Sequence, residues 1–289
     1  MIIDSHAHYN HGSYNATFRY LTRTSDGYAL AEGDRPQLLS RLWDENIRCS
    51  VEPGISLQSC EGVLALCKAN PGRIFPAIGV HPTRVFGEKW AHRRKLAELA
   101  GTPGVVAIGE TGLDYHYPRK EQHRLVQHAW FLYQLGLARR VDLPVILHVR
   151  NAHKDALRVL RRHPARHLGG VVHCYTGDWQ TAKEYLKLGY YIGIGGAILQ
   201  KAERAAAIQE TVKNMPLARI LIETDAPFIL PDCKDAIPSK QLRRARNTSL
   251  ILPAVIAKIA ELKGISPEEV ERVTAQNAIR LFDLPVEEL

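Results

Sequence analysis

Six side chains able to bind divalent metal ions lie along this sequence, each at the end of a short apolar run. The first two are His6 and His8, which follow the run Met1 to Ile3. Side chains two residues apart on a strand point to the same face, so both imidazoles can approach one metal ion. A turn with one hydrogen-bonded and one solvated histidine explains this pair equally well. The metal-site prediction therefore depends on four candidates downstream: Glu110, His148, His173 and Asp225.

A mixture of four imidazoles and two carboxylates suits divalent ions without selecting one. Imidazole binds zinc well, whereas carboxylates with water suit magnesium or manganese. Two ions about 3.5–4 Å apart can activate water and stabilise the attacking and leaving oxygens of a phosphoryl displacement. We therefore expect two divalent ions, Mg²⁺, Mn²⁺ or Zn²⁺, bridged by Glu110. Asp225 would bind metal and accept the proton of the attacking water, so Glu110 and Asp225 are the predicted catalytic residues.

Further polar residues near these positions are candidates for orienting the ligands or binding the substrate. Glu223 lies two residues before Asp225, and we favour a role in orienting a histidine ligand over a role as a further ligand. The candidates for binding a substrate phosphate are Arg150, His81 and Tyr175, with Asn151 and the RRAR segment at 243–246 as weaker ones. Each has an ordinary structural interpretation as well: an ion pair for Arg150, a turn cap for His81, and packing under a loop for Tyr175.

Eight apolar, β-branched runs carry the predicted ligands, and segments with helical spacing separate these runs. The runs are MIID, RCSVEPG, IFPAIGVHP, VVAIGETGLD, LPVILHVR, GGVVHCYTG, GYYIGIGGA and RILIETDAP. Their near-continuous apolar character indicates strands of a parallel sheet that helices cover on both sides. Eight such units fit an α/β protein with a closed (β/α)8 TIM barrel better than an open doubly wound sheet. We expect one domain over residues 1–289, with the ligands at one mouth of the barrel.

Two more helices are expected after the eighth run, over SLILPAVIAKIAELKG and SPEEVERVTAQNAIRLF. Ser266 is the expected N-cap of the second helix, Pro267 its first residue, and Glu269 the partner in a capping box. A long connection, from Gly12 to about Pro36, leaves directly from His8. Long connections in compact domains are usually functional, so we expect this one over or beside the mouth rather than in a separate domain.

Composition sets broad limits on location and partners. The five cysteines are odd in number and form no C-x-x-C pair, which argues against a disulfide framework or a structural zinc knuckle and favours a reducing cytoplasm. The sequence lacks a signal peptide pattern and any apolar stretch of about 18 residues, so we expect no membrane contact. A net charge of +8 is compatible with a nucleic-acid partner, although it is weak evidence for one. No obligatory protein partner is evident.

The motifs of this chain resemble, in order and spacing, those of the TatD-type deoxyribonucleases, a branch of the amidohydrolase-like metal-dependent barrels. The resemblance rests on DSHAH, GVHP, IGETGLDY, PVILHVR, VVHCYTG, YIGIGG, LIETDAP and TAQNAIRLF. It implies a (β/α)8 barrel with two or three divalent ions that hydrolyses phosphodiester bonds of DNA, often from the 3′ end, with RNA as a possible further substrate. It also implies metal binding by the same six residues: His6, His8, Glu110, His148, His173 and Asp225.

Two features depart from the family pattern. The family passes quickly from the His-x-His pair to the first helix, whereas here HGSYNATFRYLTRTSDGYALAEGDRP intervenes. The family typically has Arg-Asn-Glu-Pro where this chain has Arg246, Asn247, Thr248 and Ser249, so a glutamate is absent. Both departures bear on substrate more than on fold.

Two other functions are compatible with the same residues. The barrel and its metals could hydrolyse an ester, lactone or amide, with water attacking a carbonyl carbon instead of phosphorus. A non-catalytic nucleic-acid-binding protein could also keep this fold, although the complete ligand set argues against that reading.

Overall fold

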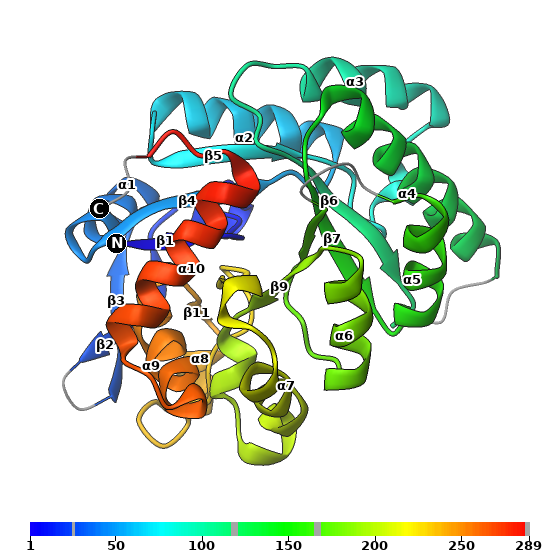
Figure 1. Cartoon of the computed structure of the whole chain (residues 1–289). Coiled ribbons are helices and arrows are strands. Elements are labelled where there is room, and N and C mark those ends of the chain that lie inside the picture. Colours follow the sequence, from blue (N-terminus) through cyan, green and yellow to red (C-terminus); the bar gives the residue numbers. More distant parts are fainter. Residues whose placement is uncertain (25–26, 117–120, 165–168, 287–289) are drawn as a thin grey trace.

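Eight parallel strands form a nearly closed barrel surrounded by helices (Figure 1). The computed structural model describes residues 1–24, 27–116, 121–164 and 169–286, so residues 25–26 of the predicted long connection and 287–289 of the predicted domain lie outside it. The strands, each paired with the next, are β1 (Ile2–Asp4), β4 (Ile47–Pro53), β5 (Ile74–Ile78), β6 (Ala107–Asp114), β7 (Val145–Arg150), β8 (Gly170–Val172), β9 (Tyr191–Ile194) and β10 (Ile220–Ile222). All eight predicted strands and the (β/α)8 TIM barrel are confirmed.

Seven helices lie in the predicted helical segments between the strands. They are α1 (Arg35–Asp44), α2 (Leu57–Ala69), α3 (Arg93–Ala100), α4 (Glu121–Val141), α5 (His153–Arg162), α6 (Trp179–Lys187) and α7 (Ala202–Asn214). In α5, Leu157 and Leu160 are buried against the barrel while Arg158 and Arg161 are exposed. This 3.6-residue pattern explains why the segment folds as a helix with one face on the sheet. Short 3-10 helices cover Val85–Gly87, Trp90–His92, Gly196–Leu199, Leu217–Arg219 and Ser249–Ile251.

The two C-terminal helices are α9 (Leu252–Lys263) and α10 (Pro267–Phe282). The predicted N-cap of α10 is present, because the Ser266 hydroxyl accepts the Glu269 backbone N–H at 3.2 Å. Apolar side chains at the end of α10, including Leu281 and Phe282, are buried in a cluster with inward-facing residues of the barrel strands. The helix therefore closes one end of the barrel, and it crosses the front of the view in Figure 1.

Inside the barrel, apolar and polar side chains occupy different layers. The layer that contacts α10 includes Ile146, Val171 and Leu221. Two residues further along the chain from each of these come His148, His173 and Glu223. Because alternate residues of a strand share a face, the same strands present an apolar layer to α10 and polar groups to the opposite mouth.

The barrel closes between β10 and β1 through backbone hydrogen bonds just beyond both strands. The Asp225 N–H donates to His6 O at 2.9 Å, and the His8 N–H donates to Ala226 O at 2.7 Å. This seam brings the His-x-His pair directly beside Asp225, although the two segments lie at opposite ends of the sequence.

The long connection after His8 forms a hairpin that joins the segment following β10. Its strands are β2 (Phe18–Thr24) and β3 (Gly27–Gly33). With β11 (Ala245–Arg246) they form a three-stranded sheet in which β2 lies between β11 and β3. Phe18 and Leu21 are buried in the main apolar cluster. A 3-10 helix (Gly12–Tyr14) precedes the hairpin, and α8 (Ser239–Leu242) precedes β11. The hairpin is therefore attached to the loop that leaves Asp225, at the mouth end of the barrel.

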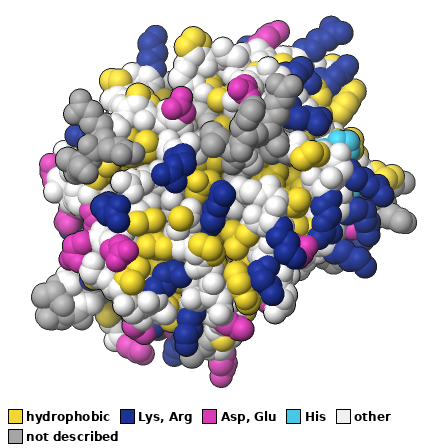
Figure 2. Space-filling view, viewed as in Figure 1, with side chains coloured by type: hydrophobic (Ala, Val, Ile, Leu, Met, Phe, Trp, Pro, Cys, Tyr) yellow, Lys and Arg dark blue, Asp and Glu magenta, His cyan; other side chains and the backbone are white. Residues whose placement is uncertain are grey.

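The surface carries mixed side chains. On the face shown in Figure 2, Lys and Arg side chains are spread over the molecule and do not form one compact patch. In the described part of the chain, no helix combines the length and apolar character needed to cross a bilayer.

Candidate metal centre

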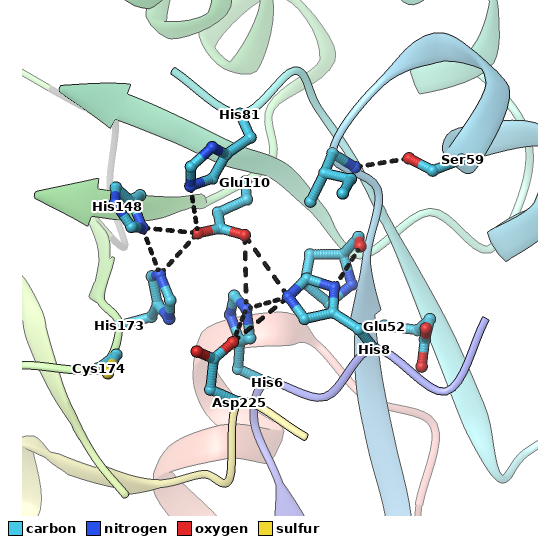
Figure 3. Close-up of polar contacts among 12 residues, drawn as sticks. His6, His8, Glu52, Ser59, His81, Glu110, His148, His173, Cys174 and Asp225 are labelled. Atoms are coloured by element: carbon cyan, nitrogen blue, oxygen red, sulfur yellow. Dashed lines mark hydrogen bonds and ion pairs between the residues drawn. The ribbon is translucent and has the colours of Figure 1, made fainter. Parts of the chain in front are cut away.

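The six predicted ligands converge around the carboxylate of Glu110 (Figure 3). Glu110 Oε1 lies 2.7 Å from His173 Nε2 and 2.9 Å from His148 Nδ1. Its other oxygen, Oε2, lies 3.7 Å from His6 Nε2 and 3.6 Å from His8 Nε2. Each carboxylate oxygen therefore faces a different pair of imidazoles, which is the arrangement expected of a carboxylate that bridges two ions.

The first group of ligand atoms contains His6, His8 and Asp225. The two Nε2 atoms are 3.1 Å apart, and Asp225 Oδ1 lies 3.6 Å from His6 Nε2 and 3.4 Å from His8 Nε2. Ligand atoms held 2.0–2.1 Å from a tetrahedral zinc ion are roughly 3.3 Å from one another. The spacing of these atoms thus fits a divalent ion between them.

The second group includes His81, which we expected to contact substrate. His81 Nε2 lies 3.3 Å from Glu110 Oε1, and its ring meets the edge of the His148 ring with centroids 4.2 Å apart. The atoms of His81, Glu110 and His148 all lie within 4.8 Å of one another. The structure therefore places His81 among the possible metal ligands as well as on the wall of the substrate cavity.

A local irregularity in β6 turns Glu110 into the barrel. Simple alternation would put Glu110 on the same outward face as Ile108, which packs against the helices. Between Ile108 and Thr111, however, β6 advances three residues while β7 advances two. Gly109 lies within this bulge at a φ of 157°, and a Cβ there would come 2.7 Å from Ile146 Cβ. Glycine at this position thus allows the backbone to present the carboxylate.

Two further carboxylates lie behind the histidine ligands. Asp114 Oδ2 is 3.0 Å from His148 Nε2, on the side of the ring away from Glu110. Glu223 is fully buried, accepts the Cys174 backbone N–H and lies 3.7 Å from His173 Nδ1. Such contacts orient metal-binding imidazoles. The 3.7 Å contact of Glu223 is longer than a hydrogen bond, so the predicted orienting role of Glu223 stays a prediction. Asp114 was not predicted, although its position at the end of the Glu110 strand was an available signal.

Asp4 is a buried carboxylate of the barrel seam that sequence reasoning did not single out. It accepts hydrogen bonds from the hydroxyls of Thr224 and Ser249, each at 2.6 Å, and from the His6 backbone N–H at 3.2 Å. Burial raises the pKa of Asp4 to about 7 against these hydrogen bonds. The Asp4 side chain thus links the end of β1 to Thr224, the residue that precedes Asp225.

Glu52 is a second buried carboxylate that was not predicted from the sequence. It fixes the backbone that follows the histidine pair. Its carboxylate accepts the backbone N–H groups of Tyr9 and Asn10, each at 2.8 Å. Burial raises the pKa of Glu52 to about 7. His8 itself is held by a contact of 3.2 Å between its Nδ1 and Pro53 O.

The site also sets the protonation of its own groups. Burial, reinforced by the facing His173, lowers the pKa of His6 well below its usual value. Burial opposes charge on Glu110 as well, but the surrounding imidazoles, with His173 foremost, hold its pKa well below the usual range. Burial likewise opposes charge on His8, yet Asp225 and Glu110 raise its pKa to about 9. Without metal, protons on imidazoles thus balance the carboxylates, and a divalent ion would displace them.

A cavity of about 800 Å³ leads to this centre and is lined by His8, His81, Glu110, His148, Asp225, Arg84 and Phe228 among others. Tyr175 does not line it. It is 1% exposed, and its hydroxyl donates to Asp178 O at 2.6 Å, so the prediction that Tyr175 binds substrate is wrong and the side chain packs under its loop. Arg150 is exposed at the end of β7, and its predicted phosphate contact stays a prediction.

Comparisons with known proteins show the family to which this chain is similar. The family described as "TatD related DNase" matches residues 3–283. An uncharacterized metal-dependent hydrolase, YabD of Bacillus subtilis strain 168, is 32% identical over 98% of this chain and 99% of its own. A protein named 3′-5′ ssDNA/RNA exonuclease TatD, from Erwinia billingiae, is 36% identical over 87% of this chain and 94% of its own. Among solved structures, YjjV, a TatD homologue from Escherichia coli K12, has a TM-score of 0.83 and 28% identity over 98% of both chains.

Proposed function

Because the chain belongs to the TatD family and is a metal-dependent hydrolase, we propose that it removes nucleotides from the 3′ end of single-stranded DNA or RNA by hydrolysing phosphodiester bonds. The observation that carries this proposal is the position of Glu110, whose Oε2 lies beside His6 and His8 and whose Oε1 lies beside His148 and His173. Paired sites of this kind serve in-line displacement at phosphorus. The name of the Erwinia relative supports the choice of a nucleic-acid strand as substrate.

We assign the ligands to two ions. One would be held by His6, His8, Asp225 and Glu110 Oε2, and the other by His148, His173 and Glu110 Oε1, with His81 beside the second. Divalent ions there, Mg²⁺, Mn²⁺ or Zn²⁺, would lower the pKa of a bound water and neutralise charge on the phosphate.

The two catalytic carboxylates have different surroundings, and these define separate roles. The Glu110 side chain is 4% exposed and is enclosed by imidazoles, so it is suited to bridging. The Asp225 side chain is 17% exposed and lines the cavity, so it can accept a proton from water attacking the substrate. Glu223 and Asp114 keep His173 and His148 in the orientation that points one ring nitrogen at Glu110.

The test is a substrate panel on protein stripped of metal and reloaded with Mg²⁺, Mn²⁺ or Zn²⁺. Single strands labelled at the 3′ or the 5′ end, together with an ester, a lactone and an amide, are offered at equal concentration. Metal-dependent, stepwise loss of the 3′ label is expected. Turnover of a carbonyl substrate without cleavage of the strands would overturn the proposal, and so would metal-loaded protein that binds strands without cleaving them.

A further inference from the structure

Phe228 presents an exposed aromatic ring to the cavity that holds the metal ligands. In the described part of the chain, six large hydrophobic side chains are exposed, and of these only Phe228 lines this cavity. It is 47% exposed and follows Asp225 by three residues. An aromatic face at this place is available to whatever molecule approaches the catalytic carboxylate.

The backbone around Phe228 is fixed even though the ring is open. The Phe228 N–H donates to Asp225 O at 2.8 Å and closes a tight turn. The buried Asn247 holds the neighbours on both sides, through its N–H to Pro227 O at 3.0 Å and its Nδ2 to Ile229 O at 3.1 Å. The backbone that carries the ring is therefore held beside Asp225.

One side of the Phe228 ring is supported by two histidines. It meets the His11 ring with centroids 5.4 Å apart at 72° and the His8 ring with centroids 6.2 Å apart at 66°. Because His8 is one of the predicted metal ligands, the Phe228 ring lies beside the candidate metal centre. A phosphate bound at that centre would bring the base of its nucleotide, one sugar away, toward this ring.

One arginine shares the cavity with this ring, because Arg84 is among the residues that line it. An aromatic platform beside cationic side chains is the usual arrangement for binding single-stranded nucleic acid.

We propose that Phe228 stacks on the base of the 3′-terminal nucleotide and that Arg84 binds an adjoining phosphate, so that the enzyme requires a base next to the bond it cleaves. This inference rests on the proposed phosphodiesterase function and specifies how its substrate is recognised.

The experiment compares two single strands of the same sequence, one with a normal 3′-terminal nucleotide and one with an abasic 3′ end. Binding is measured by fluorescence anisotropy on protein kept metal-free with EDTA, and cleavage is measured after reloading with Mn²⁺. Loss of one base stack weakens binding by about 5- to 100-fold. Wild-type protein should therefore prefer the normal strand by that factor in Kd and, during cleavage, in KM.

Three variants separate stacking from folding. Phe228→Ala should abolish the preference by weakening only the binding of the normal strand, with bound Mn²⁺ unchanged. Phe228→Trp should restore the preference because it restores an aromatic face. Phe86→Ala is the matched control, since Phe86 is similarly exposed at 41% and contacts His123 outside the cavity lining, and it should behave as wild type.

Different results overturn different claims. Equal binding of both strands by wild-type protein that cleaves them would remove the stacking role and leave the phosphodiesterase function intact. A binding preference that depends on Phe228, without cleavage of either strand, would uphold the platform and refute the proposed function. Equal weakening of both strands in Phe228→Ala, without rescue in Phe228→Trp, would also overturn the inference.

Discussion

Thr248 and Leu21, which lie 227 positions apart, are joined by a hydrogen bond of 3.2 Å from the Thr248 hydroxyl to Leu21 O. Leu21 belongs to the hairpin that follows the His-x-His pair, and Thr248 stands where the family resemblance leads us to expect glutamate. The two expected departures from the family pattern therefore contact one another. Thr248 is 0% exposed, and a glutamate there would point a buried carboxylate toward a carbonyl oxygen. We therefore expect the hairpin to disfavour a glutamate at this position.

Thr248→Glu should destabilise the fold strongly, because it buries a charge without a partner. We expect a loss of about 3–5 kcal/mol in the free energy of unfolding in urea. Thr248→Val keeps the shape and removes the hydroxyl, which donates to Leu21 O and accepts the Leu250 N–H, so it should lose about 1–3 kcal/mol. A Thr248→Glu protein as stable as wild type would show that the hairpin does not exclude the glutamate.

Asp225→Asn should nearly abolish hydrolysis while the protein stays folded and keeps much of its metal affinity. Asparagine retains one oxygen ligand but cannot accept the proton of the attacking water, and loss of a general base typically lowers the rate by about 10²–10⁴-fold. The measurements are kcat on a 3′-labelled strand at saturating Mn²⁺ and the bound metal after dialysis. Wild-type turnover by this variant would remove Asp225 from proton transfer.

Much of this centre could be predicted from sequence because its ligands follow strands with strong apolar periodicity. His148 and His173 each stand two residues after a buried inward-facing side chain, so alternation alone points them to the mouth. Glu110 is different: its place at the end of an apolar run singled it out, but only the bulge at Gly109 explains its inward direction. Such a bulge depends on how β6 pairs with β7, and the local pattern of residues carries no information about that pairing.

Other features depend on contacts between distant segments and were missed for that reason. Asp4 gains its role from Thr224 and Ser249, more than 200 positions away in the sequence. The β2–β3 hairpin gains its third strand from β11 near the other end of the chain. Tyr175 comes two residues after His173 and was therefore a candidate for substrate contact, yet the turn of the chain after His173 directs its ring into the core.

Glu223→Gln and Asp114→Asn should each weaken the centre without abolishing it. Both side chains contact the ring nitrogen of a histidine ligand that faces away from Glu110, at His173 and His148 respectively. Loss of such a partner typically costs about 10–100-fold in metal affinity or activity. Titration with Mn²⁺ should show the weakened binding, and excess metal should recover part of the activity. An effect as large as that of Asp225→Asn at saturating metal would place either residue in direct contact with the reaction.

The stability of the metal-free protein should fall as the pH rises through the neutral range, partly because of Glu52. Its pKa is raised by burial from the usual 4.5 to about 7, so the folded state favours the protonated form. The stabilisation from this proton is fully present below about pH 4.5 and is lost as the pH rises through about 7. Over that range the free energy of unfolding should fall by about 3 kcal/mol because of Glu52.

Glu52→Gln isolates that contribution, since glutamine does not titrate. Urea unfolding of both proteins in EDTA between pH 4.5 and 8 should show the stability of wild type falling more steeply than that of the variant. Parallel curves would mean that Glu52 ionises normally in the folded protein.

The central claim is that Glu110 bridges two divalent ions that act together on a phosphodiester. Its most direct test is to add Mn²⁺ in measured equivalents to metal-free protein while following cleavage of a 3′-labelled single strand. If both ions are needed, little cleavage should occur until the second equivalent binds, and Glu110→Gln should remove this two-equivalent behaviour together with the activity. Full cleavage with a single equivalent of Mn²⁺, or wild-type cleavage by Glu110→Gln, would contradict it.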